Sequence, residues 1–309
     1  MSVFLGIDTS NYTTSVSLLE NGVVTQNIKL PVAVKAGERG IRQSDAVFFH
    51  VKNLPEVMKT LGAVKPDAIG VSIRPRDVEG SYMPCFLAGL AVATSLSSAM
   101  DIPLYTFSHQ AGHVRAALYS ADRLDLTDKK LIAFHISGGT TEVLLYDAGT
   151  ITCIGGTKDI NAGQLIDRIG VVLGLSFPCG KELETLCDFE AMKKEGLTPI
   201  SSIKGLEANL SGLENKACTY LKKGASAGAV AAFVMASIEK SLSQLLKEAR
   251  SSYGDLPVIM SGGVSSNRYL QNKLSKQFGA FFAEPVYSAD NAAGIALLCQ
   301  ERYLITHGI

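Results

Sequence analysis

The sequence predicts an α/β protein in which one structural unit occurs twice. Two β-rich segments share one spacing: each contains a polar turn and ends at a glycine, Gly22 in the first and Gly149 in the second. Val16 and Val143 stand at equal distances before these glycines. After each segment, strand-like and helix-like patterns alternate, which is typical of an α/β fold.

The elements expected in the first part begin with two or three strands between residues 3 and 29. The apolar residues of Ser44–Leu61 recur at helical spacing, although Pro55 interrupts that pattern. The run Cys85–Met100 is short for a membrane span and rich in small residues, so it predicts a close-packed buried helix. Short strands are expected on either side of this helix, at 68–73 and 104–106.

The second β-rich segment, 131–154, is followed by further helices and one short buried strand. The longest predicted helix, 227–250, has an apolar face and a charged face, so we expect it to lie on a sheet. The stretch 188–221 is mixed and predicts no clear element. The remaining expectations are helices at 161–173, from 267 and from 290, and a strand at 256–260.

Composition restricts the class of function and the location. The 29 basic and 29 acidic residues leave no net charge, so any contact with nucleic acid must come from a local patch. The hydrophobic fraction of 47% and the charged fraction of 19% are typical of a compact globular protein. The six cysteines contain no CxxC pair, which favours reduced, mostly buried thiols, and Asp8 interrupts any leader-like start. These features predict a cytoplasmic protein.

Three turns rich in small residues, at 8–14, 137–141 and 261–265, predict anion binding. Glycine and small hydroxyl residues leave backbone N–H groups accessible to a phosphate. The third turn also precedes a helix, whose N-terminus attracts an anion. Each turn alone has a simpler explanation, because hairpins and tight strand-to-helix connections need glycines anyway. Together they predict the walls of one nucleotide site.

A histidine pair predicts a metal site. His109 and His113 are four residues apart, so both imidazoles project from one face of a helix and can hold one ion. The candidate for a third ligand is Asp290, which lies at an expected helix start, where it is also explained as a helix cap. A zinc peptidase needs a glutamate directly after the first histidine, and Gln110 stands there. Peptidase activity is therefore not expected.

Seven motifs in order resemble the TsaD/Gcp family of tRNA threonylcarbamoyladenosine transferases, once labelled O-sialoglycoprotein endopeptidases. The resemblance covers essentially the whole chain. It implies an actin/Hsp70/sugar-kinase-like fold of two ribonuclease-H-like domains with an interdomain cleft. We expect the N-terminal domain at 1–108, joined by the helix at about 290–309, and the C-terminal domain at 109–289. The motifs are GIDTSNYTTSVSL, SHQAGHVRAA, SGGTTEV, NAGQLIDRIGVVLGLSFPCG, SGL at 211–213, SGGVSSNR and SADNAAGIA.

The resemblance also implies the site residues. His109, His113 and Asp290 match the family's ligands for iron or zinc. The turn 137–141 matches the loop that holds the phosphate or carbamoyl part of threonylcarbamoyl-adenylate. The expected nucleotide- and substrate-binding residues are Asp8, Thr9, Ser10, Ser137, Gly138, Gly139, Thr140, Thr141, Asp167, Gly180, Gly262, Gly263 and Asn267.

The chain departs from the family pattern where acid/base and acceptor residues are expected. An acidic pair is replaced by Tyr12 and Thr13, so no catalytic residue is assigned. These departures indicate a diverged paralogue. The other differences are Arg74-Pro75-Arg76 for a glycine-rich loop, Thr140 for the usual histidine or asparagine within the loop at 137–141, Gln164 for a glutamate, and Glu214 for a lysine.

The function expected first is transfer of threonylcarbamoyl from its adenylate to adenosine of tRNA, with one divalent metal and ATP or AMP bound. One alternative is a carbamoyltransferase with another acceptor, in which Arg74 and Arg76 recognise an anionic group. Another is a non-catalytic nucleotide-binding partner of the true enzyme. The resemblance also implies protein partners: a homologue, or a kinase or ATPase component of a modification complex.

Overall fold

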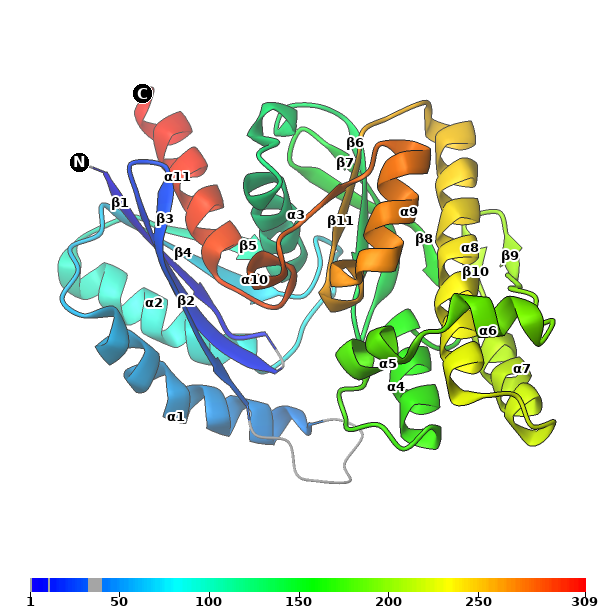
Figure 1. The fold of residues 1–309 in the computed structure, drawn as a ribbon. Helices are drawn as coiled ribbons and strands as arrows, with labels where there is room; N and C mark the ends of the chain where they lie inside the picture. The colour runs from blue at the N-terminus through cyan, green and yellow to red at the C-terminus, as the bar shows by residue number, and fades with distance from the viewer. Residues whose placement is uncertain (1, 11, 33–40) are drawn as a thin grey trace. The chain divides into compact units, whose positions relative to one another are not determined.

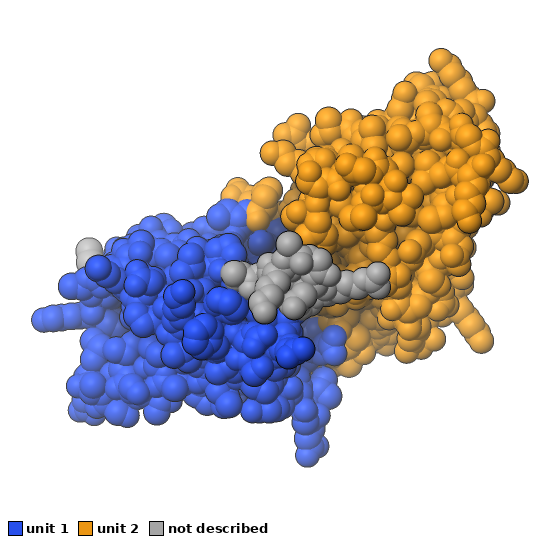
Figure 2. Space-filling model, turned by 90° about the horizontal axis from the view of Figure 1, so that it is seen from below, with its two compact units in different colours: residues 1–127, 286–309 blue, residues 128–285 orange. Residues whose placement is uncertain are grey.

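The computed structural model describes residues 2–10, 12–32 and 41–309. The chain forms two compact units, which Figure 2 distinguishes by colour. Unit 1 comprises Met1–Thr127 with Val286–Ile309, and unit 2 comprises Asp128–Pro285. Unit 1 is therefore made from both ends of the chain, and unit 2 from the middle.

The sheet of unit 1 has the strand order β3-β2-β1-β4-β5. The strands β1, β2 and β3 pair antiparallel, whereas β4 and β5 run parallel to β1 (Figure 1). The bounds are β1 (Val3–Asp8), β2 (Thr13–Glu20), β3 (Val23–Pro31), β4 (Ala68–Arg74) and β5 (Leu104–Ser108). In this order the carboxyl end of β1 lies next to that of β4, the edge at which α/β proteins bind ligands.

Helices cover both faces of this sheet. On one face, α1 (Gln43–Leu61) and α2 (Phe86–Met100) pack against Leu5, Ile7 and Val71. On the other face, α11 (Ala293–His307) packs on β1 and on α3 (His109–Ser120), around Phe4 (Figure 1). The short elements are the 3₁₀ turn η1 (Leu124–Leu126) and α10 (Pro285–Ser288). The helix predicted at 44–61 is confirmed, with Pro55 inside it.

The sheet of unit 2 repeats the plan of the first. Its order is β12-β11-β6-β7-β8-β10-β9, in which β6, β7 and β8 are antiparallel and β11 and β12 run parallel to β6. The predicted duplication is thereby confirmed at the level of topology. The bounds are β6 (Leu131–Ile136), β7 (Thr141–Asp147), β8 (Thr150–Thr157), β9 (Ile203–Lys204), β10 (Glu207–Ala208), β11 (Val258–Ser261) and β12 (Phe281–Phe282).

The second turn of each β-rich segment shows the same backbone geometry. Asn21 and Gly22 have φ angles of 50° and 82°, and Ala148 and Gly149 have φ angles of 43° and 92°. Two consecutive positive φ angles define the hairpin turn that matches the right-handed twist of its strands. The glycines at equal spacing in the sequence are therefore the residues that this turn requires.

The long helix α8 is the centre of unit 2, and most of its residues are buried. Among the described residues it alone is long and apolar enough to cross a membrane, yet 83% of that apolar window is buried within the protein. Such burial is typical of a core helix. The helical bounds are α4 (Ala162–Val172), α5 (Gly180–Leu186), α6 (Phe189–Lys194), α7 (Ser211–Lys222), α8 (Ala227–Tyr253), η2 (Gly263–Ser266) and α9 (Arg268–Phe278).

Two expected boundaries differ from the structure. Unit 1 extends to Thr127, beyond the boundary expected after residue 108, because α3 packs against α11. The last helix begins at Ala293 rather than at Asp290, with Ala292 as its N-cap residue. The prediction of mostly buried thiols is also only partly met. Cys85, Cys179 and Cys299 are buried, Cys187 and Cys218 are half-buried, and Cys153 is exposed, with no disulfide among the six.

Candidate metal centre

Two histidines project from the first turn and a half of α3. The hydroxyl of Ser108 caps this helix by accepting a hydrogen bond of 3.1 Å from the backbone N–H of Ala111. His109 is the first helical residue and His113 follows one turn later, so their imidazoles lie side by side. The distance between their Nε2 atoms is 2.9 Å.

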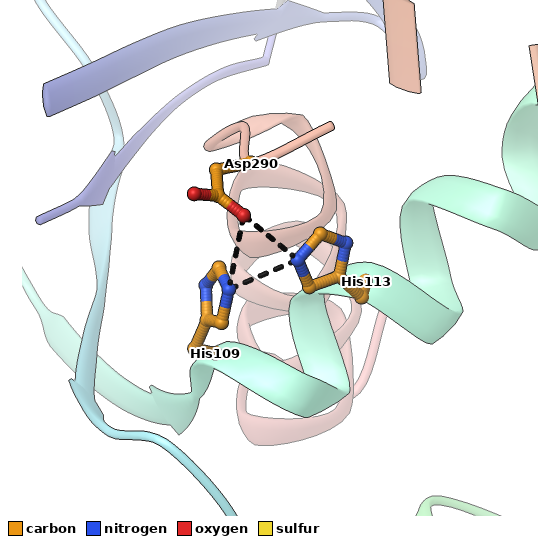
Figure 3. Close-up of side chains that lie close together, drawn as sticks. All are labelled: His109, His113 and Asp290. Carbon is orange, nitrogen blue, oxygen red and sulfur yellow. Dashed lines mark hydrogen bonds and ion pairs between the residues drawn. The ribbon is translucent and has the colours of Figure 1, made fainter. Parts of the chain in front are cut away.

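Asp290 reaches the same point from the other end of the chain. Its Oδ1 lies 3.4 Å from Nε2 of His113 and 3.6 Å from Nε2 of His109. Figure 3 draws both contacts as dashed lines. Asp290 stands two residues before the N-cap position of α11, so it is not the cap of that helix. Both histidines and this carboxylate belong to unit 1.

The segment that carries Asp290 is held on both sides. The amide Nδ2 of Asn291 donates to the carbonyls of Tyr287 and Ala289, and its Oδ1 accepts from the N–H of Ala293. The ammonium group of Lys29, on β3, donates to the carbonyl of Val286. These bonds fix the backbone around Asp290 before any ligand is bound.

A close crossing of two helices brings the ligands together. A Cβ atom on Gly294 would lie 1.8 Å from the carbonyl oxygen of Gly112, which no real atom pair tolerates. Gly294 is in the first turn of α11, and Gly112 lies between the two histidines on α3. The absence of a side chain at Gly294 is therefore what allows Asp290 to approach the histidine pair.

A buried carboxylate, Asp8, orients the first histidine. Its Oδ1 lies 3.0 Å from Nδ1 of His109 and also accepts a hydrogen bond from the hydroxyl of Ser72. Its Oδ2 accepts from the hydroxyl of Ser10 at 2.7 Å. A carboxylate behind a metal-binding imidazole fixes the ring and leaves the other nitrogen for the ion. Asp8 was expected to bind nucleotide, and this contact with His109 was not predicted.

Charges inside the centre set the protonation of the two rings. Burial by itself lowers the pKa of His109, but the carboxylates of Asp8 and Asp290 outweigh burial and raise this pKa to about 10. Burial, followed by the charge on His109, lowers the pKa of His113. Burial opposes ionisation of Asp290, yet its bonds to the two histidines hold its pKa well below the usual value. In the metal-free protein His109 is thus a cation at neutral pH, which donates from Nδ1 to Asp8 and from Nε2 toward His113. Nε2 loses its proton when it binds an ion.

The three ligand atoms have the separations that one ion requires. Two ligands at about 2.1 Å from a metal, at angles between octahedral and tetrahedral, stand about 3.0–3.4 Å apart. The observed distances of 2.9, 3.4 and 3.6 Å lie within about 0.2 Å of this range. Two imidazoles and one carboxylate on one side of an ion are a ligand set used for both iron and zinc. The residues present therefore fit a divalent metal.

The loop that replaces the family's glycine-rich segment supports α3. Arg74 bonds to Asp77 at 2.9 Å, and Asp77 accepts a hydrogen bond from Ser108, the cap of α3. The carbonyl of Pro75 accepts from the N–H of Gln110. The charge of Arg74 is thus already compensated by a carboxylate, a contact that weakens the expectation that it recognises an anionic substrate.

Other departures from the family pattern have structural partners. Gln164 closes a capping box at the start of α4, since its Oε1 accepts from the N–H of Asn161 at 3.0 Å. Glu214 pairs with Arg168 at 3.0 Å. Tyr12 is exposed, and Thr13 is the first residue of β2. Asn11, in the same turn, lies outside the described residues.

The turn at 137–141 in unit 2 is tied to α4. Asn161 donates to the carbonyl of Gly139 at 2.8 Å, and Thr141 accepts from the N–H of Ala162 at 2.9 Å. A Cβ atom on Gly163 would collide with Gly138, so the turn lies directly on the start of the helix. Within the turn, the N–H of Ser137 donates to the carbonyl of Thr140 at 2.8 Å.

The other residues of unit 2 that were expected to bind nucleotide also contact neighbouring parts of the protein. Gly262, with a φ of 90°, lies against the carbonyl of Ile136 and so beside the turn. Gly263 begins η2, and Asn267 caps α9. Asp167 accepts from the N–H of Cys179 at 2.8 Å, directly before Gly180. Burial raises the pKa of Asp167.

The three predicted contacts of unit 1 lie at the end of β1. Thr9 bonds to the start of α2: its hydroxyl donates to the carbonyl of Cys85 and accepts from the N–H of Gly89. Asp8 and Ser10 belong to the network around His109. A single nucleotide site walled by loops of both units stays a prediction.

Comparison with known proteins identifies the family of this chain. A family model described as TsaD, tRNA N6-adenosine threonylcarbamoyltransferase, matches residues 33–297. The chain belongs to the TsaD family. A tRNA N6-adenosine threonylcarbamoyltransferase of Thermus thermophilus is 29% identical over 310 residues, which cover 97% of this chain and 92% of that protein. The resemblance found in the motifs is confirmed.

One further TsaD relative is longer than this chain. A probable bifunctional tRNA threonylcarbamoyladenosine biosynthesis protein of Thermoplasma volcanium is 26% identical, over 95% of this chain and 55% of that protein.

Solved structures agree on the fold alone. They include HypF in a phosphate- and nucleotide-bound form, with a TM-score of 0.64, 14% identity and coverage of 98% of this chain and 46% of that one. A Streptomyces griseus ROK glucokinase with glucose and AMPPNP has a TM-score of 0.53, 12% identity and coverage of 97% and 100%. The expected sugar-kinase-like fold is confirmed.

Proposed function

We propose that this TsaD-family protein binds one divalent ion, iron or zinc, through His109, His113 and Asp290, together with an adenine nucleotide. The observation that carries the proposal is the convergence of three ligand atoms at separations of 2.9 to 3.6 Å. Asp8 supports it, because a carboxylate behind His109 orients the ring for an ion. When bound, the ion supplies a Lewis acid for oxygens of the substrate.

The proposed reaction is transfer of threonylcarbamoyl from its adenylate to adenosine of tRNA. The exocyclic amine of adenosine attacks the carbamoyl carbon, the bond from that carbon to the phosphate oxygen breaks, and AMP leaves with the electron pair. The amine loses one proton in the same exchange. The turn Ser137–Thr141 is the proposed holder of the phosphate, since it offers glycine backbone next to a helix start.

A second candidate is transfer to a different acceptor. The observation that favours it is the identity of residues 12 and 13. Tyr12 and Thr13 stand where the family has an acidic pair, so a carboxylate near the acceptor is missing. A third is a nucleotide-binding partner of a more typical family member. We also infer protein partners and a cytoplasmic location, because the relatives act on tRNA and one of them is bifunctional.

Incubation of the purified, metal-loaded protein with threonylcarbamoyl-adenylate and unmodified tRNA tests these candidates. Mass spectrometry of digested tRNA should detect threonylcarbamoyladenosine, and AMP should appear in equal amount. AMP release that depends on another acceptor, without modified tRNA, would favour the second candidate. Nucleotide binding with no turnover until a homologous protein is added would favour the third.

A further inference from the structure

A buried histidine on α1 lies beside the metal centre with one ring nitrogen unused. His50 is fully buried, and its Nδ1 lies 2.8 Å from the hydroxyl oxygen of Thr14. The amide Nδ2 of Asn53 donates to the same hydroxyl oxygen at 3.3 Å. The Nε2 atom of His50 is shielded from solvent and has no hydrogen-bond partner among the residues the structure describes.

The donors and acceptors of this group determine the state of the ring. Asn53 donates to Thr14, so the single hydroxyl proton of Thr14 is available for Nδ1 of His50. Burial lowers the pKa of His50, which keeps the ring neutral at neutral pH. A neutral ring that accepts at Nδ1 carries its proton on Nε2. The unused atom is therefore an N–H donor, and a buried donor without an acceptor is costly.

Packing places this donor close to the metal centre. Thr14 precedes Ser15, which pairs with Asp8 across β1 and β2. One turn before His50 on α1, Ala46 packs with Phe86, whose ring centroid is 6.2 Å from that of His109. The negative charges of Asp8 and Asp290 also act on the His50 ring.

The two nearby carboxylates already have other partners. Asp8 accepts from His109, Ser72 and Ser10, and Asp290 faces the two histidines of α3. No described residue supplies an acceptor for Nε2 of His50, so a bound ligand is the candidate. Next to a divalent cation, the ligand group with oxygen acceptors to spare is a phosphate.

We propose that Nε2–H of His50 donates a hydrogen bond to a phosphate oxygen of the nucleotide bound at the metal centre. This inference rests on the proposed function. It makes α1 a part of the substrate site, in addition to the sheet edge and α3. It also explains why a second polar side chain, besides Asn53, is buried on the helix that buries Leu54 and Val57.

Two variants of His50 separate its role in nucleotide binding from its role in packing. His50→Phe keeps an aromatic ring and removes both nitrogens, whereas His50→Gln keeps an acceptor for Thr14 and a donor in place of Nε2–H. We expect His50→Phe to retain the full metal content and to weaken ATP binding, measured by calorimetry on metal-loaded protein, by about tenfold or more. His50→Gln should recover part of this affinity.

An NMR resonance of the parent protein tests the hydrogen bond without any substitution. The ¹⁵N-labelled Nε2–H of His50 should shift downfield when ATP is added to the metal-loaded protein, because its proton enters a hydrogen bond. Equal ATP affinity in the parent and His50→Phe, or an unshifted resonance at saturating ATP, overturns the inference and leaves the proposed function standing. A parent protein that binds metal but no ATP overturns both.

Discussion

Asp8 Oδ1 lies 3.0 Å from Nδ1 of His109, while Nε2 of the same ring faces His113 and Asp290. The end of the first strand thus controls which nitrogen of a predicted metal ligand is available to an ion. We therefore expect this carboxylate to affect metal affinity without direct contact with the metal.

Replacing Asp8 by alanine should weaken metal binding. The loss of the carboxylate frees the His109 ring to rotate, and it removes the negative charge that makes the ring a stronger ligand. We expect a decrease in affinity of about 10- to 100-fold, measured by competition with a chelator. Asp101→Asn, at an exposed left-handed position after α2, is the control and should bind metal like the parent. An unchanged affinity in Asp8→Ala would show that the ring is oriented by other contacts.

Removal of either histidine should remove the ion. His109→Ala and His113→Ala each leave two ligands, which do not hold a divalent metal against a chelator. Metal analysis of the purified proteins measures occupancy. His307→Ala, at the exposed end of α11, is a matched control that should keep the parental content. Equal occupancy in all four proteins would mean that the metal binds elsewhere.

The metal-free protein should lose stability as the pH rises from 7 to 10. The pKa of His109 is about 10 in the folded protein against an ordinary value of 6.5. Protonation of this ring therefore stabilises the fold fully below about pH 6.5, and the contribution disappears as the pH rises through 10. The expected slope is at most about 1.4 kcal/mol per pH unit.

Urea unfolding of the chelator-treated protein at several pH values measures this slope. Other groups titrate in the same range, so the informative quantity is the difference between the parent and His109→Gln. That difference should shrink as the pH approaches 10. Parallel curves for the two proteins would contradict a raised pKa at this position.

Substitution of Gly294 should disrupt the crossing of α3 and α11. A methyl group would meet the carbonyl of Gly112 at 1.8 Å, so the helices must separate, and Asp290 moves away from the histidines. We expect Gly294→Ala to lower the free energy of unfolding by about 1–3 kcal/mol or more, and to weaken metal binding as well. Gly212→Ala is the control, because its Cβ enters open space on α7, and it should be neutral or slightly stabilising. Parental stability in Gly294→Ala would show that the crossing adapts at little cost.

The features that could be predicted from the sequence are those that depend on the spacing of nearby residues along the chain. The glycines at 22 and 149 marked two hairpins of one geometry, and the four-residue interval between His109 and His113 placed both rings on one helix face. The contact between Asp8 and His109 could not be predicted, because it depends on the order β1-β4-β5 and on the connection from β5 into α3. The start of α11 was placed three residues early, because aspartate is a frequent N-cap residue. Here Asp290 contacts the two histidines instead.

The candidate metal centre draws its three ligands from residues 109, 113 and 290, and all of unit 2 is encoded between the second and the third. During synthesis the chain therefore completes the whole of unit 2 before the last ligand has left the ribosome. A nascent or truncated chain can present the histidine pair but cannot close the site around an ion. We therefore expect metal loading only after the chain has been synthesised beyond Asp290, when the segments on either side of unit 2 have met.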